Sequence, residues 1–243
     1  MNPHLLEAAR ETPLFEGLSS DRRARAASAF CLRLYERGET ISGSADTNPY
    51  VYTIASGVAR SIRINQDGRC LTSGLLAAGA VFGRLPYLES DTTEQVEALV
   101  DTLVFRASTA DLESLAAVDP IVARNLARSN AERLRDVETR LIALAFHPVP
   151  VRVAGVLIEL ADHFGKVTTQ GVRLDIQMTH GSLAELSITT RETVTKIAGW
   201  LRNEEIASIE RRLIWINNWN ALEDVHAGRY CMPGRAGKAG MPA

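Results

Sequence analysis

A stretch of 26 residues without glycine or proline, from Ile121 to Phe146, constrains the fold of this 243-residue chain more than any other feature. His147-Pro148 ends the stretch, because proline disfavours helix at the residue before it. An uninterrupted helix of this length would extend about 39 Å at a rise of about 1.5 Å per residue. It separates an earlier part of the chain from a later one, and each part is long enough to bury its own core.

The part before the helix has the pattern of short β-strands. Residues 50–64 are rich in β-branched and aromatic side chains, an Asp-Gly turn follows them, and residues 95–108 alternate between apolar and polar. Glycines separate the apolar runs at intervals that suit a small antiparallel roll, and we expect most of them to make turns. These glycines are Gly57, Gly68, Gly74, Gly79 and Gly83.

The long helix carries one narrow stripe of mostly apolar residues in alternating steps of four and three, the spacing of a heptad seam. The stripe consists of Ala123, Ala127, Asn130, Leu134, Val137, Leu141 and Leu144. It could pack against the chain's own domain. Because charged residues fill the remaining faces, we favour a homodimer whose seam runs from Asn130 to Leu144, with the polar Asn130 selecting the register.

After the proline break the pattern becomes mainly helical. An amphipathic helix ends at Gly165, residues 166–178 can form a short β excursion, and residues 178–217 have the pattern of helix, tight turn, helix and β-hairpin. The second helix of that pair has a buried face at i, i+3, i+4 and i+7, made by Val194, Ile197, Ala198 and Leu201.

The predicted fold class is therefore α+β, with an N-terminal antiparallel β-roll, a long dimerisation helix and a C-terminal winged helix-turn-helix. The predicted domains are residues 1–120 for the roll, 121–146 for the helix and 147–225 for the winged helix-turn-helix. Residues 226–243 are rich in Gly, Ala and Pro and are expected to form a flexible tail.

Polar side chains gather at the start of the second helix of the pair, and they are Thr190, Arg191, Glu192, Thr193 and Lys196. A helix N-terminus presents free amide groups and a partial positive charge, which suit a phosphate. Arginine and lysine match the acceptors of guanine, and glutamate can accept from the cytosine amine. Since helix-turn-helix proteins place this end of the helix against base edges, the pattern predicts binding to double-stranded DNA.

The same residues also fit a purely structural role. Thr189 and Glu192 are spaced as a T-x-x-E capping box, and Glu192 and Lys196 are spaced for a solvated ion pair. Judged alone, capping and base contact explain these residues equally well. The helix before them and the hairpin after them favour the DNA interpretation.

Charge and composition limit the function classes. The net charge is −2, and residues 148–243 hold 11 basic against 10 acidic residues, so DNA binding would depend on local placement of charge. Three widely spaced cysteines predict a reducing cytoplasm, and the lack of an apolar run of about eighteen residues predicts no membrane span. The sequence shows no metal-ligand spacing, P-loop or G-x-S-x-G motif, so we expect no metal, no cofactor and no enzymatic activity.

The chain resembles the CRP/FNR superfamily of bacterial transcription regulators. The resemblance covers nearly the whole chain and rests on TPLFEGLS, GAVFGRL, the long helix ending in LALAF, and MTHGSLAEL followed by TTRETVTKIAGWL. It implies a homodimer that binds a two-fold DNA site with TGTGA-like half-sites and activates by contact with RNA polymerase, through the segment around residues 165–171. Arg191, Glu192 and Lys196 would contact bases, and Thr179 and Thr190 would hold phosphates.

Two positions depart from the family pattern near the DNA-binding helix. Lys196 stands where many relatives carry arginine, which could relax the preference for guanine there. Ile188 stands in the turn where relatives usually place glycine. If its φ is positive, a β-branched residue costs about 1–2 kcal/mol at this position.

The positions that hold a cyclic nucleotide in such relatives are poorly matched here. Arg84 replaces the ribose-binding glutamate in the family's F-G-E-L motif. Thr92 and Thr93 fall at the phosphate-binding arginine and its hydroxyl neighbour, and Val137 and Glu138 fall at the adenine-facing pair. Without the arginine a buried phosphate loses its charge-assisted pair, so we expect DNA binding that does not need cAMP.

The alternative is a regulator that is switched by an unidentified anion or another ligand in the roll. Arg84 could bind such an anion. It could instead pair with Glu94, Glu97 or Glu138 and so fill the degenerate pocket, which is the interpretation we favour.

Overall fold

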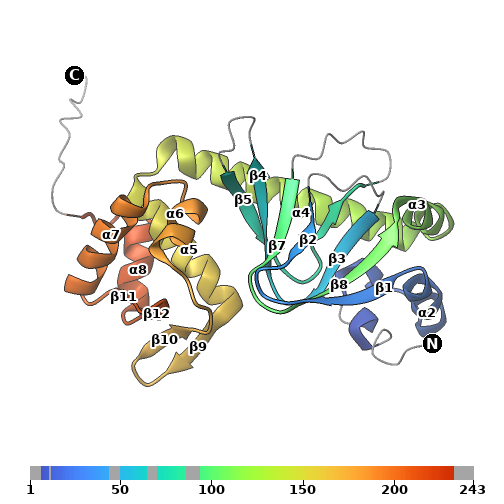
Figure 1. The fold of residues 1–243 in the computed structure, drawn as a ribbon, viewed down its shortest axis with the longest axis horizontal. Helices are drawn as coiled ribbons and strands as arrows, with labels where there is room; N and C mark the ends of the chain where they lie inside the picture. The colour runs from blue at the N-terminus through green and yellow to red at the C-terminus, as the bar shows by residue number, and fades with distance from the viewer. Residues whose placement is uncertain (1–6, 11, 44–49, 65–69, 86–93, 233–243) are drawn as a thin grey trace. The chain divides into compact units, whose positions relative to one another are not determined.

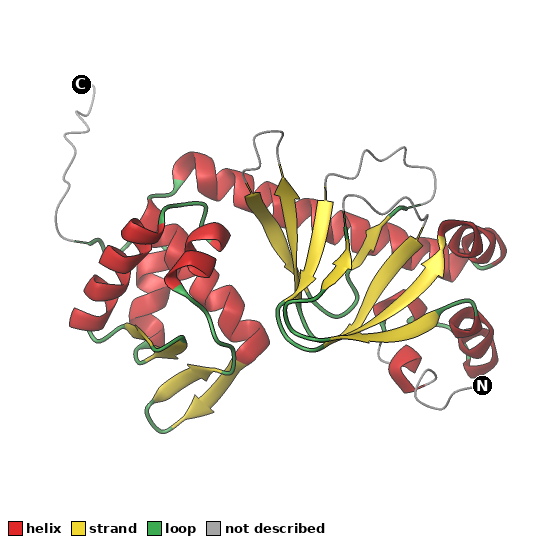
Figure 2. Ribbon diagram, viewed as in Figure 1, coloured by secondary structure: helices red, strands yellow, loops and turns green. Residues whose placement is uncertain are grey.

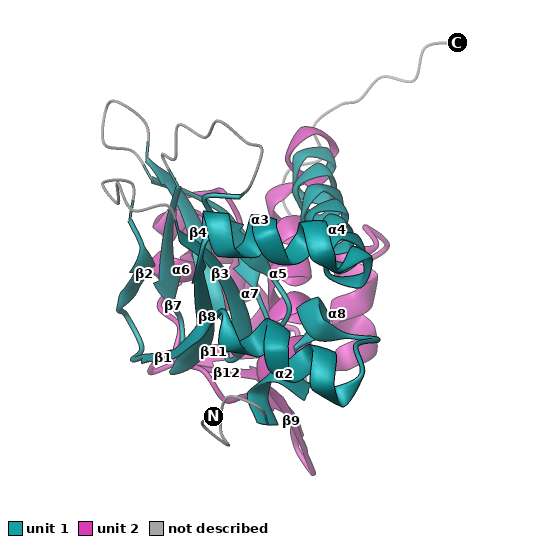
Figure 3. Ribbon diagram, turned by 90° about the vertical axis from the view of Figure 1, so that its right-hand side faces the viewer, with its two compact units in different colours: residues 1–142 teal, residues 143–243 magenta. Residues whose placement is uncertain are grey.

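The computed structural model describes residues 7–10, 12–43, 50–64, 70–85 and 94–232. The chain forms two compact units, residues 1–142 and 143–243, which are coloured separately in Figure 3 and are described one at a time. Two of the residues predicted for the effector pocket, Thr92 and Thr93, lie outside the described residues, as does Gly68.

The first unit contains a β-roll made of two antiparallel four-stranded sheets (Figure 1). One sheet has the order β1-β8-β3-β6 and the other the order β2-β7-β4-β5. The strands are β1 (Cys31–Tyr35), β2 (Thr40–Ser42), β3 (Tyr50–Ser56), β4 (Ala59–Ile64), β5 (Cys70–Leu76), β6 (Val81–Gly83), β7 (Glu94–Ala98) and β8 (Thr102–Ser108). The α+β class predicted from the sequence is confirmed, with strands in the roll and helices around it (Figure 2).

Alternation along the strands directs one set of side chains into the interior of the roll. Three aromatic rings, Phe15, Phe30 and Phe105, meet edge to face with centroids 5.4 to 6.1 Å apart. In a second cluster Tyr52 stacks on Phe82 with centroids 5.3 Å apart. The second cluster lies inside the roll, between its two sheets, whereas the first lies where the β1-β8-β3-β6 sheet meets the helices of the unit.

The glycines of the roll have different roles. Gly57 has φ +92°, and a Cβ there would come within 2.7 Å of the Asp101 carbonyl oxygen, so this turn requires glycine. Gly74 was expected in a turn but lies inside β5. A Cβ at Gly74 would lie 3.7 Å from Nε of Arg140, so the long helix passes close to this strand.

The helices of the first unit are η1 (Pro13–Phe15), α2 (Ser20–Ser28), α3 (Thr109–Val118) and α4 (Pro120–Phe146). Helix α4 confirms the predicted long helix and begins one residue earlier, with proline in its first turn, where no amide partner is lost. Its first half packs on the chain's own roll. Val122 is fully buried, and the side-chain amide of Asn125 donates to the carbonyl oxygens of Leu14 and Glu16 at 3.1 and 2.8 Å.

The second half of α4 is exposed in the single chain. Along the predicted seam the exposed fractions are 59% for Leu134, 45% for Val137, 64% for Leu141 and 43% for Leu144. Asn130 is half-buried and donates from Nδ2 to the Leu126 carbonyl oxygen of its own helix at 3.1 Å. The first half of the helix thus packs on the chain's own domain, whereas the seam residues from Leu134 onward stay 43–64% exposed among the described residues.

The second unit holds the remaining elements. They are α5 (Val149–Phe164), β9 (Gly165–Thr168), β10 (Gly171–Leu174), α6 (His180–Leu186), α7 (Arg191–Asn203), β11 (Ala207–Glu210), β12 (Leu213–Ile216) and α8 (Trp219–His226). The four strands form one antiparallel sheet in the order β11-β12-β10-β9. The predicted buried face of α7 is present, with Val194 fully buried and Leu201 only 1% exposed.

Part of the segment predicted as a flexible tail is folded. Helix α8 extends to His226, and Tyr230 stacks on Trp200 with ring centroids 5.9 Å apart and donates its hydroxyl to Glu204. The composition of the segment did not reveal this contact, because a single aromatic residue suffices to anchor it. Among the described residues, no helix combines the length and apolar character required to cross a membrane.

Candidate nucleic-acid interface

The candidate interface is built on two helices whose starts are fixed by threonine caps. Thr179 accepts from the Ser182 amide at 3.0 Å at the start of α6, and Thr190 accepts from the Thr193 amide at 3.3 Å at the start of α7. Each cap satisfies one of the free amides of the first helical turn. The apolar faces of the two helices are buried together and fix the angle at which α7 is presented.

The turn between the helices has the strained backbone that the family pattern implied. Ile188 has φ +51°, in the left-handed region that disfavours β-branched side chains. Its neighbour Thr189 donates its amide to the Ala184 carbonyl oxygen at 2.9 Å, which closes the end of α6. The Ile188 amide also donates to the Glu185 carbonyl oxygen at 3.3 Å, so two consecutive amides tie the strained turn to the end of α6.

This strain predicts an unusual order of stability. Ile188→Gly should exceed Ile188→Ala in free energy of unfolding by about 1 kcal/mol, because alanine retains the left-handed penalty and glycine does not. At an ordinary helical position the order would be reversed. All three tryptophans, Trp200, Trp215 and Trp219, lie in the second unit, so urea unfolding followed by tryptophan fluorescence reports on this unit. An alanine variant as stable as the glycine variant would contradict the prediction.

The six residues predicted to contact DNA all lie at the starts of α6 and α7. Thr179, Thr190, Arg191, Glu192 and Lys196 are exposed, and Thr193 is half-buried. The predicted capping box was displaced by one residue: the N-cap is Thr190, not Thr189. Only Thr189 has a glutamate three residues later, but Thr190 can cap a helix equally well, so the backbone geometry and not the spacing decides which threonine is the N-cap.

Glu192 is held at the helix start in the isolated chain. Its pKa lies below the usual value, first because its carboxylate accepts from its own backbone amide and then because it accepts from the Thr190 hydroxyl. A carboxylate in the first turn also interacts favourably with the helix dipole. The structural role foreseen for Glu192 therefore applies to the free protein, and a base contact would have to replace these bonds.

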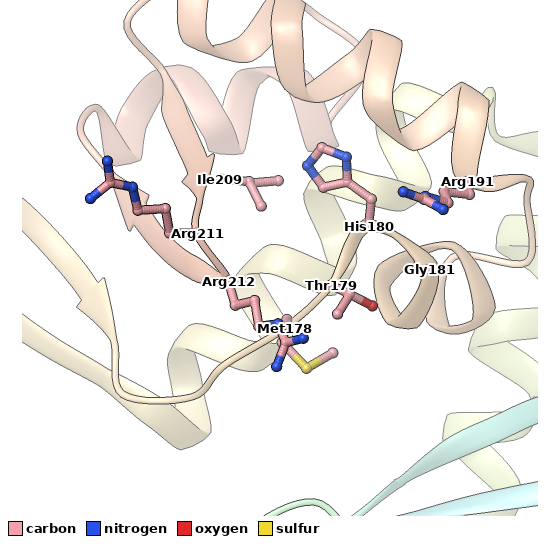
Figure 4. A pocket seen from close by; sticks show the side chains of 8 residues that line it. All are labelled: Met178, Thr179, His180, Gly181, Arg191, Ile209, Arg211 and Arg212. Carbon is pink, nitrogen blue, oxygen red and sulfur yellow. The ribbon is translucent and has the colours of Figure 1, made fainter.

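A shallow groove of about 470 Å³ lies beside the start of α7 (Figure 4). Its lining combines the starts of α6 and α7 with the β11–β12 hairpin, and consists of Met178, Thr179, His180, Gly181, Arg191, Ile209, Arg211 and Arg212. These eight residues include three arginines and no acidic residue. A groove of this charge next to a helix N-terminus suits a phosphate backbone.

Sequence reasoning identified Thr179 and Arg191 but missed His180, Arg211 and Arg212. The sequence did contain a signal for the two arginines. Arg211-Arg212 stands between two strand-like segments, where a tight hairpin turn would favour Asn or Gly. Both residues have positive φ, +51° and +70°, as a two-residue type I′ turn requires. Arginine at both central positions destabilises the turn, because a residue with a Cβ disfavours positive φ.

His180 links the two helices. Its Nδ1 lies 2.9 Å from Oγ1 of Thr195, and the Thr195 hydroxyl donates to the Arg191 carbonyl oxygen at 2.9 Å. A hydroxyl has one proton, so when both bonds form, His180 donates from Nδ1. This arrangement leaves Nε2 as the atom of His180 that is available for a further contact.

Three of the residues predicted for the effector pocket, Arg84, Val137 and Glu138, lie among the described residues. Arg84 is exposed, and its carbonyl oxygen accepts from the Thr109 hydroxyl at 2.7 Å. Val137 is 45% exposed on α4, and Glu138 beside it is exposed.

The carboxylates proposed as partners of Arg84 are engaged elsewhere. Glu94 forms an ion pair with Arg133, and Glu97 pairs with Arg60 at 3.2 Å. The prediction that Arg84 pairs with Glu94 or Glu97 is therefore wrong. Spacing along the chain could not show that Glu97 pairs with Arg60 of the neighbouring strand β4, or that Glu94 pairs with Arg133 of α4.

Comparison with known proteins gives consistent matches over both units. Residues 32–119 match the cyclic nucleotide-binding domain family, and residues 151–225 match the Crp-like helix-turn-helix domain family. The chain is 32% identical over 218 residues to the cyclic AMP receptor protein of Thermus thermophilus, and the alignment covers 89% of this chain and 98% of that protein.

Solved structures agree with this match. The structure of FixK2 from Bradyrhizobium japonicum superposes with a TM-score of 0.67 at 27% identity, over 81% of this chain and 96% of FixK2. A transcriptional regulator of the CRP/FNR family from Thermus thermophilus superposes with a TM-score of 0.70 at 23% identity, over 82% of this chain and 100% of that one, and it supports the fold alone.

Proposed function

Since this chain belongs to the CRP/FNR family of DNA-binding transcription regulators, we propose that it binds a two-fold DNA site as a homodimer and needs no cAMP to do so. The observation that carries the proposal is the groove at the start of α7, lined by Arg191, Arg211 and Arg212. The family assignment places the chain among transcription regulators and not among enzymes.

In the proposed complex the start of α7 enters the major groove. Arg191 and Lys196 donate to guanine acceptors, and Glu192 accepts from a cytosine amine once it leaves its cap. Thr179, Thr190 and Thr193, together with the amides of the first helical turns, hold phosphates. The predicted half-site resembles TGTGA.

A homodimer presents two such helices one turn of DNA apart. The exposed apolar seam on α4 supports this proposal, because soluble monomers rarely expose contiguous apolar surface without function. Activation would follow from contact with RNA polymerase through the β9–β10 hairpin. Val167 in β9 is 89% exposed, which suits a protein contact.

Independence from cAMP rests on the chemistry of the roll. Arg84 is exposed at the position of the ribose-binding glutamate, and the described part of the roll buries a carboxylate, Glu94, against α4. Glu94 already pairs with Arg133, so this arginine is not free to form a charge-assisted bond with a cyclic phosphate. The Thermus thermophilus relative is named for cyclic AMP, but that name describes the relative.

The proposal is tested by fluorescence anisotropy on a labelled TGTGA-N6-TCACA duplex, with and without cAMP, over a salt series. We expect specific binding without cAMP, well above that to a scrambled duplex. The slope of log affinity against log salt then gives the number of phosphates contacted. Binding that requires cAMP would overturn the proposal, and binding that requires another added anion would support the effector-gated alternative.

The two turn arginines predict opposite effects on stability and on affinity. The double variant Arg211→Asn/Arg212→Gly should stabilise the second unit by about 1–2 kcal/mol, because Asn-Gly suits a type I′ turn. The same variant should weaken DNA binding and reduce the salt slope by about 0.9 for each phosphate that the hairpin no longer binds. Tryptophan fluorescence during urea unfolding and anisotropy measure the two effects.

The matched control for this prediction is Arg211→Lys/Arg212→Lys, which keeps both charges and the same backbone strain. It should change neither stability nor salt slope appreciably. If the Asn-Gly variant binds DNA with an unchanged salt slope, the arginines of the hairpin do not contact phosphates.

A further inference from the structure

Glu94 is a buried carboxylate that no DNA contact explains. It is the first residue of β7, and its side chain is only 10% exposed. Ser61 of β4 donates to its Oε1 at 2.5 Å, and Arg133 of α4 forms an ion pair with the same oxygen. The carboxylate thus joins the roll to the long helix, within the first unit.

The hydrogen bonds around Glu94 form a directed chain. Oγ of Ser61 and Oγ of Ser73 lie 2.7 Å apart. Because the single proton of Ser61 is given to Glu94, Ser61 Oγ can only accept from Ser73, whose hydroxyl also lies 3.3 Å from the Ser61 carbonyl oxygen. Three elements, β4, β5 and α4, therefore converge on one carboxylate. Burial of a charge is costly unless it is paired and hydrogen-bonded, and both conditions are met here.

Arg133 lies between the half of α4 that contacts the roll and the half that is exposed. Before it, Ser129 bonds to the roll at Gly79 and Val81, with distances of 3.1 and 3.3 Å. Immediately after it, Leu134 is 59% exposed and the predicted seam begins. Of the bonds made by Ser129 and Arg133, the ion pair lies nearer to the exposed half of the helix.

We propose that Glu94 acts as a built-in anionic ligand. Its carboxylate neutralises Arg133 and ties α4 to the roll at the start of the seam, in the position that an external anion would otherwise have to occupy. This inference rests on the proposed DNA binding without cAMP and gives it a physical cause. The seam half of α4 is held in a DNA-competent arrangement because the bridging anion is part of the chain.

The chain offers a close control. Glu97 lies on the same strand and also pairs with an arginine, but its partner Arg60 belongs to β4 of the same sheet. The side chains of Glu97 and Arg60 are 24% and 18% exposed. Glu97→Gln thus removes a comparable half-buried charge pair without touching α4.

The test compares Glu94→Gln with Glu97→Gln in the full chain, by hydrogen exchange of α4 in the free protein and by DNA anisotropy without cAMP. Glu94→Gln should speed exchange in residues 130–142 by about tenfold or more, because the helix loses its anchor. It should weaken specific DNA binding about 5- to 150-fold, the usual range of coupling between sites. Glu97→Gln should change both quantities less than about threefold.

A double variant distinguishes two effects of Glu94: its bond to Arg133, which ties α4 to the roll, and the burial of its charge. If the two groups act on each other, Glu94→Gln/Arg133→Gln should bind DNA no more weakly than the worse single variant, because no charge is left unpaired. Additive losses, or equal effects of Glu94→Gln and Glu97→Gln, would overturn the inference. If Glu94→Gln does not fold, Glu94→Asp, which keeps the charge but shortens the side chain, should give intermediate exchange in α4, and unchanged exchange would overturn it.

The two readouts distinguish failure of the inference from failure of the proposed function. A wild-type chain that needs cAMP for DNA binding would contradict the proposed function. Hydrogen exchange in α4 would still show whether Glu94 anchors the helix. Wild-type binding without cAMP, together with an unaffected Glu94→Gln variant, would contradict the inference alone.

Discussion

Replacing Arg191 with alanine is expected to weaken binding of the proposed homodimer to a TGTGA-N6-TCACA duplex by about 2–6 kcal/mol. A bidentate arginine–guanine contact contributes about 1–3 kcal/mol of discrimination, and a two-fold complex makes it twice. The loss corresponds to about 30-fold to more than 10,000-fold in the dissociation constant. Anisotropy titrations at fixed salt, on the specific and on a scrambled duplex, measure it.

Arg202 provides the matched control, because it lies near the other end of the same helix and is also exposed. Arg202→Ala should leave specific affinity within about threefold of the wild type, since its charge acts through screened solvent. If Arg191→Ala weakens the specific and the scrambled duplex equally, Arg191 contacts phosphate and does not read a base. If neither duplex is affected, the start of α7 is not the recognition surface.

The second large effect concerns the seam. Leu134→Glu/Leu141→Glu should convert the dimer to a monomer, because it places four carboxylates in one interface that two leucines from each chain would otherwise fill. Each buried leucine contributes about 1.5–3 kcal/mol, so the dimer dissociation constant should rise by at least about a thousandfold. Light scattering after size-exclusion chromatography measures the mass, and anisotropy should show a parallel loss of specific DNA binding.

The fold of the single chain should survive this change, because Leu134 and Leu141 are 59% and 64% exposed within it. Circular dichroism should therefore be unchanged. Thr139→Glu is the control: it adds a carboxylate to an exposed position on the same helix, outside the predicted seam. A double-leucine variant that remains dimeric would show that the chains associate through another surface.

Elements with a strong local pattern were predictable from the sequence. The length of α4 follows from a run without glycine or proline, the roll follows from alternating strands, and the buried face of α7 follows from its 3.6-residue period. At Ile188 the family pattern left a different turn geometry and a strained residue as alternatives, and the positive φ in the structure shows the strained one. Each of these signals is contained within a few neighbouring residues.

Features that depend on long-range contacts were not predictable in the same way. Glu94 and Arg133 are 39 residues apart, and no local period relates a strand start to the middle of a helix. Tyr230 anchors on Trp200 from a segment whose composition indicates disorder. The hairpin arginines were visible, but their place beside Arg191 depends on how β11 and β12 pack against α6 and α7.

If the exposed half of α4 is the dimer seam, the amount of active dimer depends on the concentration of the chain in the cell. Where most chains are monomeric, mass action makes the dimer concentration grow with the square of the chain concentration, so a twofold rise in synthesis gives about a fourfold rise in dimer. If Glu94 is the built-in anion proposed above, no small messenger is needed, and the association of two chains makes the response nonlinear. The affinity of the seam from Leu134 to Leu144 would set the expression level at which target promoters respond.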